Sequence, residues 1–206
     1  MALLTMLILG LITIRNSNRI ICALDRIVID KHNIRKEVST YLIFIIYLIY
    51  VNIFSNPFDI IIYSTIYLIL YLISLIDSQE SMIPDKYIVC ILIIGLLNAT
   101  INKVSIKEMM YSISPILFIL ILVLIIEKIM KCNEDEEVFG GGDIKLLFAL
   151  SISMGLENIL ALLFLSHLLF ILRNNKGEGF VPFAPYIYKG YIGMFLLKNV
   201  YSYLIF

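Results

Sequence analysis

The chain has 206 residues, of which 61% are hydrophobic, and its formal net charge is zero. Soluble domains are about 45–50% apolar, so this composition argues against an ordinary water-soluble domain. The neutral charge gives no sign of a nucleic-acid partner, and we expect none. Cys22, Cys90 and Cys132 have no metal-type spacing and form no CxxC pair, so the sequence predicts no metal site.

Apolar segments of membrane-spanning length recur along the chain and predict an all-α fold, a polytopic bundle of about eight transmembrane helices. The segments are residues 2–14, 40–56, 59–76, 86–101, 110–129, 143–155, 157–172 and 186–205. The first and sixth are short for a bilayer of about 30 Å, so their ends are the least defined. In the absence of tryptophan, we expect Tyr41, Tyr47, Tyr63 and Tyr67 to lie at the membrane surfaces.

The first 38 residues form the first of two predicted regions, a membrane helix followed by a short basic cytoplasmic segment, and residues 39–206 form a membrane-embedded domain. The start lacks a basic region and a cleavage site, which favours a membrane helix over a signal peptide. Within residues 15–38, Ile20, Leu24, Ile27 and Val28 follow helical spacing. This pattern predicts a helix lying on the membrane surface.

The distribution of lysine and arginine predicts the orientation of the chain. All of these residues except Lys103, Lys107 and Lys198 fall in loops that follow the odd-numbered segments. By the positive-inside rule those loops are cytoplasmic and both termini are outside. The sequence therefore predicts a multi-pass protein of the cell membrane.

Two aspartates interrupt the apolar pattern on the predicted cytoplasmic side. Asp77 closes the third segment, where an acid meets the unfavourable C-terminal end of a helix dipole. Asp143 follows Gly140, Gly141 and Gly142 at the predicted start of the sixth segment. Glycines at this point would allow positive φ angles and the close approach of another chain.

Two carboxyl groups brought together can share one proton, so that one acts as a base on a water molecule and the other as an acid. Such a pair of carboxyl groups can hydrolyse a peptide bond without a metal or a covalent intermediate. On spacing alone, two ordinary solvated loop acids remain possible, as does the ion or proton site of a transporter or channel. Acids near mid-span would favour the transporter, whereas Asp77 and Asp143 lie at span ends.

Four sequence segments resemble those of the type IV prepilin peptidases, membrane aspartyl proteases of the GxGD kind. "EEVFGGGDIKLL", residues 136–147, resembles the family signature E-x-x-G-x-G-D-x-K-L. "LIDSQESMIPD", residues 75–85, is similar to the second motif, in which an Asp precedes Ile/Leu-Pro-Asp/Asn. "LIIGLLN", residues 92–98, and "VPFAPYI", residues 181–187, also resemble family segments, and together the four cover roughly residues 60–195.

The resemblance implies that Asp77 and Asp143 are the catalytic pair and that residues 39–206 form the peptidase domain. The implied substrate is a prepilin or pseudopilin-like protein with a short basic leader and a hydrophobic helix. It would be cut at the cytosolic boundary of the membrane, typically after glycine. Expected supporting residues are Gly140, Gly141, Gly142, Lys145, Glu137, Pro84, Asp85, Pro182 and Pro185.

Several of these supporting residues have a specific expected role. Pro84 and Asp85 suit the first turn of the helix after Asp77, with Asp85 as a structural cap. Lys145 is expected to reach the lipid headgroups, or alternatively to position Glu137 or the substrate.

The remaining polar segments allow more than one role. The acidic run at residues 134–137 is either a solvated charge cluster or an attractor of a basic leader. Pro182 and Pro185 are expected to shape a substrate groove beside the acids. His167, inside the seventh segment, is expected to make a hydrogen bond between helices.

Long members of this family also methylate the new N-terminus of the substrate and carry paired CxxC motifs in the first cytoplasmic loop. The corresponding loop, residues 15–38, contains only Cys22. We therefore expect no zinc and no other cofactor, with S-adenosylmethionine needed only if methyltransferase activity is retained.

Two further alternatives concern the protease class itself. Signal-peptide-peptidase-like enzymes have a Tyr-Asp pair where this chain has Ile76-Asp77. An inactive scaffold is disfavoured because both acids are present. For an active enzyme, the helix dipoles suggest the hypothesis that Asp143 is ionised at rest and that Asp77 holds the shared proton.

Overall fold

The computed structural model describes residues 2–25, 34–54, 56–130, 140–173 and 182–204, and over these ranges the chain is helical with no strand. The all-α prediction is confirmed. The helices are α1 (Ala2–Arg15), α2 (Ser17–Asp25), α3 (Ile34–Phe54), α4 (Pro57–Glu80), α5 (Asp85–Ile101), α6 (Ile106–Met130), α7 (Gly141–Met154), α8 (Leu156–Arg173) and α9 (Ala184–Leu204).

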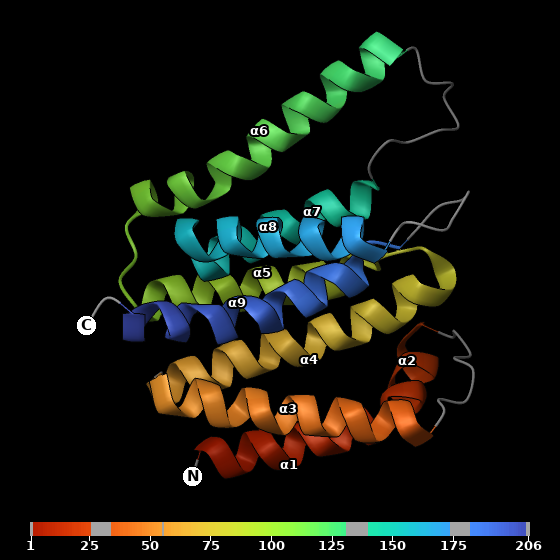
Figure 1. Cartoon of the computed structure of the whole chain (residues 1–206), viewed down its shortest axis with the longest axis vertical. Helices are drawn as coiled ribbons and strands as arrows, with labels where there is room; N and C mark the ends of the chain where they lie inside the picture. Colours follow the sequence, from red (N-terminus) through yellow and green to blue (C-terminus); the bar gives the residue numbers. More distant parts are fainter. Residues whose placement is uncertain (1, 26–33, 55, 131–139, 174–181, 205–206) are drawn as a thin grey trace. The chain divides into compact units, whose positions relative to one another are not determined.

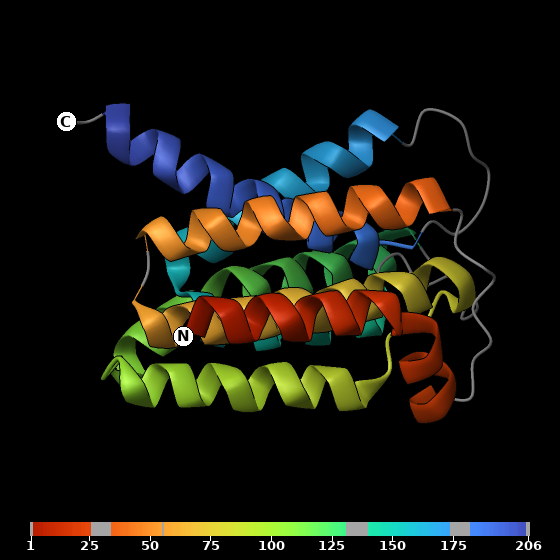
Figure 2. The ribbon, with the colours of Figure 1, turned by 90° about the horizontal axis from the view of Figure 1, so that it is seen from below.

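Each of the eight predicted apolar segments coincides with one helix, and α2 lies in the basic segment where a surface helix was expected. Among the described helices, α4 is long and apolar enough to cross a membrane by length and composition. Helices α1 and α2 add a second candidate if they are counted as one span, bent by 71°. Figure 2 shows this bend between the two red helices near the N-terminus. The number of eight spans stays a prediction.

The described helices belong to two compact units, Met1–Met82 with Phe164–Phe206, and Ile83–Leu163. This division is a finding about packing. The predicted boundary between residues 38 and 39 separates the first membrane helix and its basic segment from the membrane-embedded domain. It stays a prediction.

In the first unit, α1, α3 and α4 lie side by side, and α9 packs along α4 (Figure 1). Buried tyrosines join α3, α4 and α9. The Tyr67 and Tyr188 hydroxyls are 2.6 Å apart, and the rings of Tyr47 and Tyr67 stack with centroids 4.5 Å apart. Tyr47 and Tyr67 are fully buried, so the expectation that they anchor helices at the membrane surface is wrong. Their hydroxyls find partners inside the protein instead.

Helices α4 and α9 run antiparallel. The Tyr191 hydroxyl donates a hydrogen bond to the Tyr63 carbonyl oxygen at 3.0 Å, while Tyr188, earlier in α9, meets Tyr67, later in α4. Following this order, the start of α9 reaches the last turn of α4. The tyrosine contacts thus fix which part of α9 meets the end of α4.

In the second unit, α5 and α7 run parallel because they contact each other at corresponding ends. Near their starts, Lys145 Nζ bonds Asp85 Oδ1 at 2.9 Å, and near their ends Asn98 Nδ2 donates to the Ser153 carbonyl oxygen at 2.9 Å. At the same end, a Cβ added at Gly95 would lie 3.0 Å from Ser153 Cβ. A glycine at this position therefore permits the close approach of α5 and α7.

Candidate active site

Asp77 lies in the last turn of α4, which continues to Glu80 and is therefore longer than the predicted segment ending at residue 76. The helix ends at Ser81, a residue in the left-handed conformation (φ 51°), whose N–H donates to the Asp77 carbonyl oxygen at 2.9 Å. The Asp77 side chain is only 3% exposed. A buried carboxyl group needs a hydrogen-bond partner, because burial removes its water.

The backbone N–H of Ala184 is that partner. It donates to Asp77 Oδ2 at 3.0 Å. Ala184 is the first residue of α9, so Asp77 faces the positive end of the α9 dipole as well as the negative end of its own helix. The dipole argument that made Asp77 the proton holder considered only α4, and it no longer distinguishes the two acids. Where the proton resides stays a prediction.

Pro182 and Pro185 flank the segment that meets Asp77. Pro185 lies in the first turn of α9, where its missing N–H costs no helical hydrogen bond, and Pro182 precedes that helix. The prolines therefore help to start α9 beside the acid. Their role in a substrate groove stays a prediction.

Aromatic side chains support the start of α9. The ring of Phe183 lies 5.1 Å from that of His167 and 5.7 Å from that of Phe170, measured between centroids. The ring of His167 thus packs against Phe183, next to the residue that bonds Asp77. Its expected hydrogen bond between helices stays a prediction.

Asp143 lies in the first turn of α7, which begins at Gly141 with Gly140 as the N-cap residue. Its side chain is 6% exposed. Its backbone N–H donates to the Gly140 carbonyl oxygen at 3.0 Å. The prediction that Asp143 stands at a helix N-terminus is confirmed, and a negative charge is favoured at this end of a helix.

Of the three glycines before Asp143, Gly142 allows close packing, and none of the three has a positive φ angle. Gly140 has φ −60°, and the only described glycine with a positive φ is Gly155. The expectation of positive φ angles in these glycines is therefore wrong. The chain enters α7 through ordinary extended backbone. A Cβ added at Gly142 would lie 3.1 Å from Ile83 Cβ, whereas one at Gly141 would meet nothing within 4 Å.

Lys145 and Asp85 form an ion pair, at 2.9 Å between Nζ and Oδ1. Asp85 is the first residue of α5, Pro84 is its N-cap residue, and no side chain caps this helix. The expectation that Asp85 is a cap is wrong, because its carboxylate bonds the lysine ammonium instead. Both side chains are mostly exposed, so the pair contributes at most about 1 kcal/mol to stability.

The two aspartates belong to different compact units, Asp77 to the first and Asp143 to the second. Each is described within its own unit, and their pairing stays a prediction. Glu137 and the rest of the acidic run at residues 134–137 lie outside the described residues. Among the described residues, no group of three His, Cys, Asp or Glu side chains could hold a metal ion, and action without a cofactor stays a prediction.

The comparison with known proteins gives one match. A model of the type IV leader peptidase family matches residues 64–174, which is more than half of the chain. The chain belongs to the type IV leader peptidase family. No curated protein and no solved structure matches it.

Membership in the leader peptidase family confirms the resemblance carried by the two aspartate motifs. The matched region contains Asp77, the Ile83-Pro84-Asp85 segment and Asp143. It ends before the segment at residues 181–187, which the sequence analysis expected beside the acids without assigning a role to Ala184. Pro185 marks the helix start whose first N–H bonds Asp77.

The Ala184 hydrogen bond can be removed by Ala184→Pro, because proline lacks the N–H yet fits the first turn of a helix. We expect the peptidase activity to fall about tenfold or more, because the buried carboxyl group loses its hydrogen-bond partner. Ala184→Ser keeps the N–H and should retain near-normal cleavage. Equal rates for the two variants would show that the bond does not matter.

The close approach at Gly142 generates a second prediction. A branched side chain there must displace Ile83 or the start of α7, so Gly142→Val should lower cleavage about tenfold, as expected for overpacking. Ile83→Ala in the same chain should restore part of the rate by making room. Gly141→Val, at the position without near neighbours, should cause a smaller loss. Failure of Ile83→Ala to restore any activity would exclude this contact as the cause.

Proposed function

We propose that this leader peptidase is a membrane-embedded aspartic endopeptidase that removes the leader of prepilin or pseudopilin-like proteins at the cytoplasmic membrane face. Asp77 and Asp143 would form the catalytic pair. The observation that supports this most strongly is that both carboxyl groups are buried in an apolar helical protein, Asp77 against the first residue of α9 and Asp143 in the first turn of α7. Buried acids in such surroundings are rare without a function.

The proposed chemistry needs the two acids within reach of one water molecule. One carboxylate takes a proton from the water while the protonated partner donates a hydrogen bond to the scissile carbonyl oxygen. The Ala184 N–H orients Asp77 Oδ2 and leaves Oδ1 for the water or the substrate. The first turn of α7 stabilises a negative charge on Asp143.

A membrane location is supported by the outer surfaces of the helices. Large apolar side chains are exposed on several of them, for example Ile8 on α1, Ile93 on α5, Phe118 on α6 and Phe164 on α8. A water-soluble monomer rarely exposes so much apolar surface. The acyl chains of a lipid bilayer are a more favourable environment for these side chains than water.

The directions of neighbouring helices support the proposed multi-pass topology. If α1 and α3 to α9 are eight successive spans, then α5 and α7 cross in the same direction and α4 and α9 in opposite directions. The parallel pair in the second unit and the antiparallel pair in the first agree with this order. The bias of lysine and arginine then puts both aspartates on the cytoplasmic side.

The proposed reaction uses no cofactor. Water is the nucleophile and the two carboxyl groups carry the proton transfers, so neither zinc nor another metal takes part. S-adenosylmethionine would be required only for a separate methylation of the product.

The direct test is co-expression with a candidate prepilin and mass spectrometry of the product. The wild-type chain should release a shortened protein, and Asp77→Asn and Asp143→Asn should each reduce its formation by at least about a hundredfold, because a dyad works as a unit. Glu80→Gln, one turn beyond Asp77 and exposed, is the matched control and should cleave normally. Cleavage by either aspartate variant at the wild-type rate would contradict the assignment.

The pairing of the acids has its own test, independent of catalysis. Asp77→Cys and Asp143→Cys are combined in a chain whose Cys22, Cys90 and Cys132 are replaced by serine. In membranes, a short bifunctional thiol reagent should join the two positions, because a shared proton requires carboxyl groups within a few ångströms. The product is detected as an internally linked peptide after digestion.

The control for this crosslink pairs Asp77→Cys with Met154→Cys, at the opposite end of α7. Residue 154 is 11 residues from Asp143, about 16 Å along the helix, so a short reagent should not reach it. Equal crosslinking from both positions, or none from position 143, would contradict the proposed pair.

A further inference from the structure

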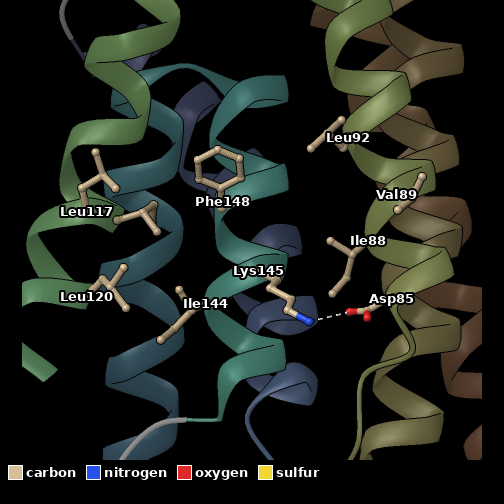
Figure 3. A pocket seen from close by; sticks show the side chains of 10 residues that line it. Asp85, Ile88, Val89, Leu92, Leu117, Leu120, Ile144, Lys145 and Phe148 are labelled. Carbon is tan, nitrogen blue, oxygen red and sulfur yellow. Dashed lines mark hydrogen bonds and ion pairs between the residues drawn. The ribbon is translucent and has the colours of Figure 1, made fainter. Parts of the chain in front are cut away.

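A groove opens between α5, α6 and α7 in the second unit, with a volume of about 610 Å³. Its walls are almost entirely apolar. Val89 and Leu92 come from α5, Leu117 and Leu120 from α6, and Phe148 from α7, as Figure 3 shows. An open apolar groove of this size is in the range of sites for one small or flexible molecule, about 300–1,000 Å³.

The polar groups of the wall are gathered at one end of the groove. They belong to the ion pair of Lys145 and Asp85, which Figure 3 draws at the starts of α7 and α5. The side chains are 59% and 71% exposed, so both charges can be reached from outside. An ammonium has three N–H donors, and the bond to Asp85 uses one of them. This end of the groove can therefore receive a negative and a positive group together.

The groove lies on the side of α7 away from Asp143. An α-helix turns by about 100° per residue, so Ile144, Lys145 and Phe148 lie about 100°, 200° and 140° around the axis from Asp143. These three residues line the groove and Asp143 does not. A peptide held in the groove would thus be separated by α7 from the proposed catalytic carboxyl group.

The size of the groove also argues against a substrate helix as the occupant. A helix with its side chains is about 10–12 Å wide, so only two turns occupy on the order of 1,000 Å³. A single hydrocarbon chain is narrower and flexible, and it can follow the leucines and the valine along the wall. Burial of its methylene groups against these side chains favours binding.

We propose that this groove binds one zwitterionic glycerophospholipid, with an acyl chain along α5, α6 and α7 and the headgroup at the Lys145–Asp85 pair. The lipid phosphate would accept hydrogen bonds from the Lys145 ammonium, and the headgroup ammonium would donate to the Asp85 carboxylate. A headgroup of opposite charges matches a neutral ion pair, whereas a purely anionic headgroup would face Asp85 without compensation.

The test uses the purified whole chain in mild detergent, with native mass spectrometry as the readout. Phosphatidylethanolamine and phosphatidylglycerol with identical palmitoyl and oleoyl chains are the probes. The wild-type chain should retain one phosphatidylethanolamine with about fivefold preference over phosphatidylglycerol, the ratio expected for one exposed charge contact. A wild-type chain that retains neither lipid, or both equally, would overturn the proposal.

Two substitutions separate the acyl chain from the headgroup. Val89→Trp fills the groove from α5 and should weaken retention of phosphatidylethanolamine about tenfold. Phe118→Trp is the matched control, because residue 118 is as exposed to the surroundings but does not line the groove. Asp85→Asn should reverse the preference in favour of phosphatidylglycerol, since Lys145 then meets the anionic headgroup alone. Equal effects of the two tryptophans, or an unchanged preference in Asp85→Asn, would contradict the proposal.

Competition distinguishes the remaining occupants in the wild-type chain. Soluble phosphoethanolamine in excess should not displace the lipid, because it lacks the acyl chain. Displacement would show that the site binds the phosphate group alone and would contradict the proposal. The apolar segment of a prepilin-like peptide should not displace it either, and displacement would assign the groove to the substrate. Asp77→Asn should bind lipid as the wild type does, so loss of cleavage leaves this test unaffected.

Discussion

A carboxyl group buried among apolar helices needs other groups to replace the hydrogen bonds of the water it has lost. At Asp77 that replacement is a backbone N–H from the first residue of α9, a helix that starts more than one hundred residues later in the chain. The bond requires α4 to extend one turn beyond its most apolar part, α9 to begin at Ala184, and the two helices to lie antiparallel in one register. Buried tyrosine hydroxyls between α4 and α9 fix that register.

Asp143 receives its support in a different way. It lies within the first turn of its own helix, where the unpaired N–H groups of the helix start favour a negative charge. Gly142 then allows the residues before α5 to pack directly against this turn. One acid thus depends on a long-range contact between α4 and α9, while the other depends mainly on local chain geometry and one close packing contact.

This difference explains what could be predicted from the sequence. The positions of the helices follow from the hydropathy of the chain, and the location of Asp143 at a helix start follows from the glycines and the apolar run after it. The role of Ala184 could not be predicted, because every residue except proline has a backbone N–H. The residue type therefore does not show which N–H bonds a carboxyl group. The partner of Asp85 could not be predicted either. Its place in the first turn of a helix suggested a cap, but its carboxylate bonds Lys145, which lies 60 residues away in the sequence.

The parallel contact of α5 and α7 has a mechanical consequence. The two helices are joined at their starts by Lys145 and Asp85 and near their ends by Asn98 and Ser153, and Gly95 also lies close to Ser153. The contacts hold the two helices in one register along most of the length of α7. Ser153 is ten residues from Asp143, about 15 Å along α7. Sliding of α5 past α7 would have to break the contacts at both ends, so these contacts fix the position of the Asp143 turn along α5.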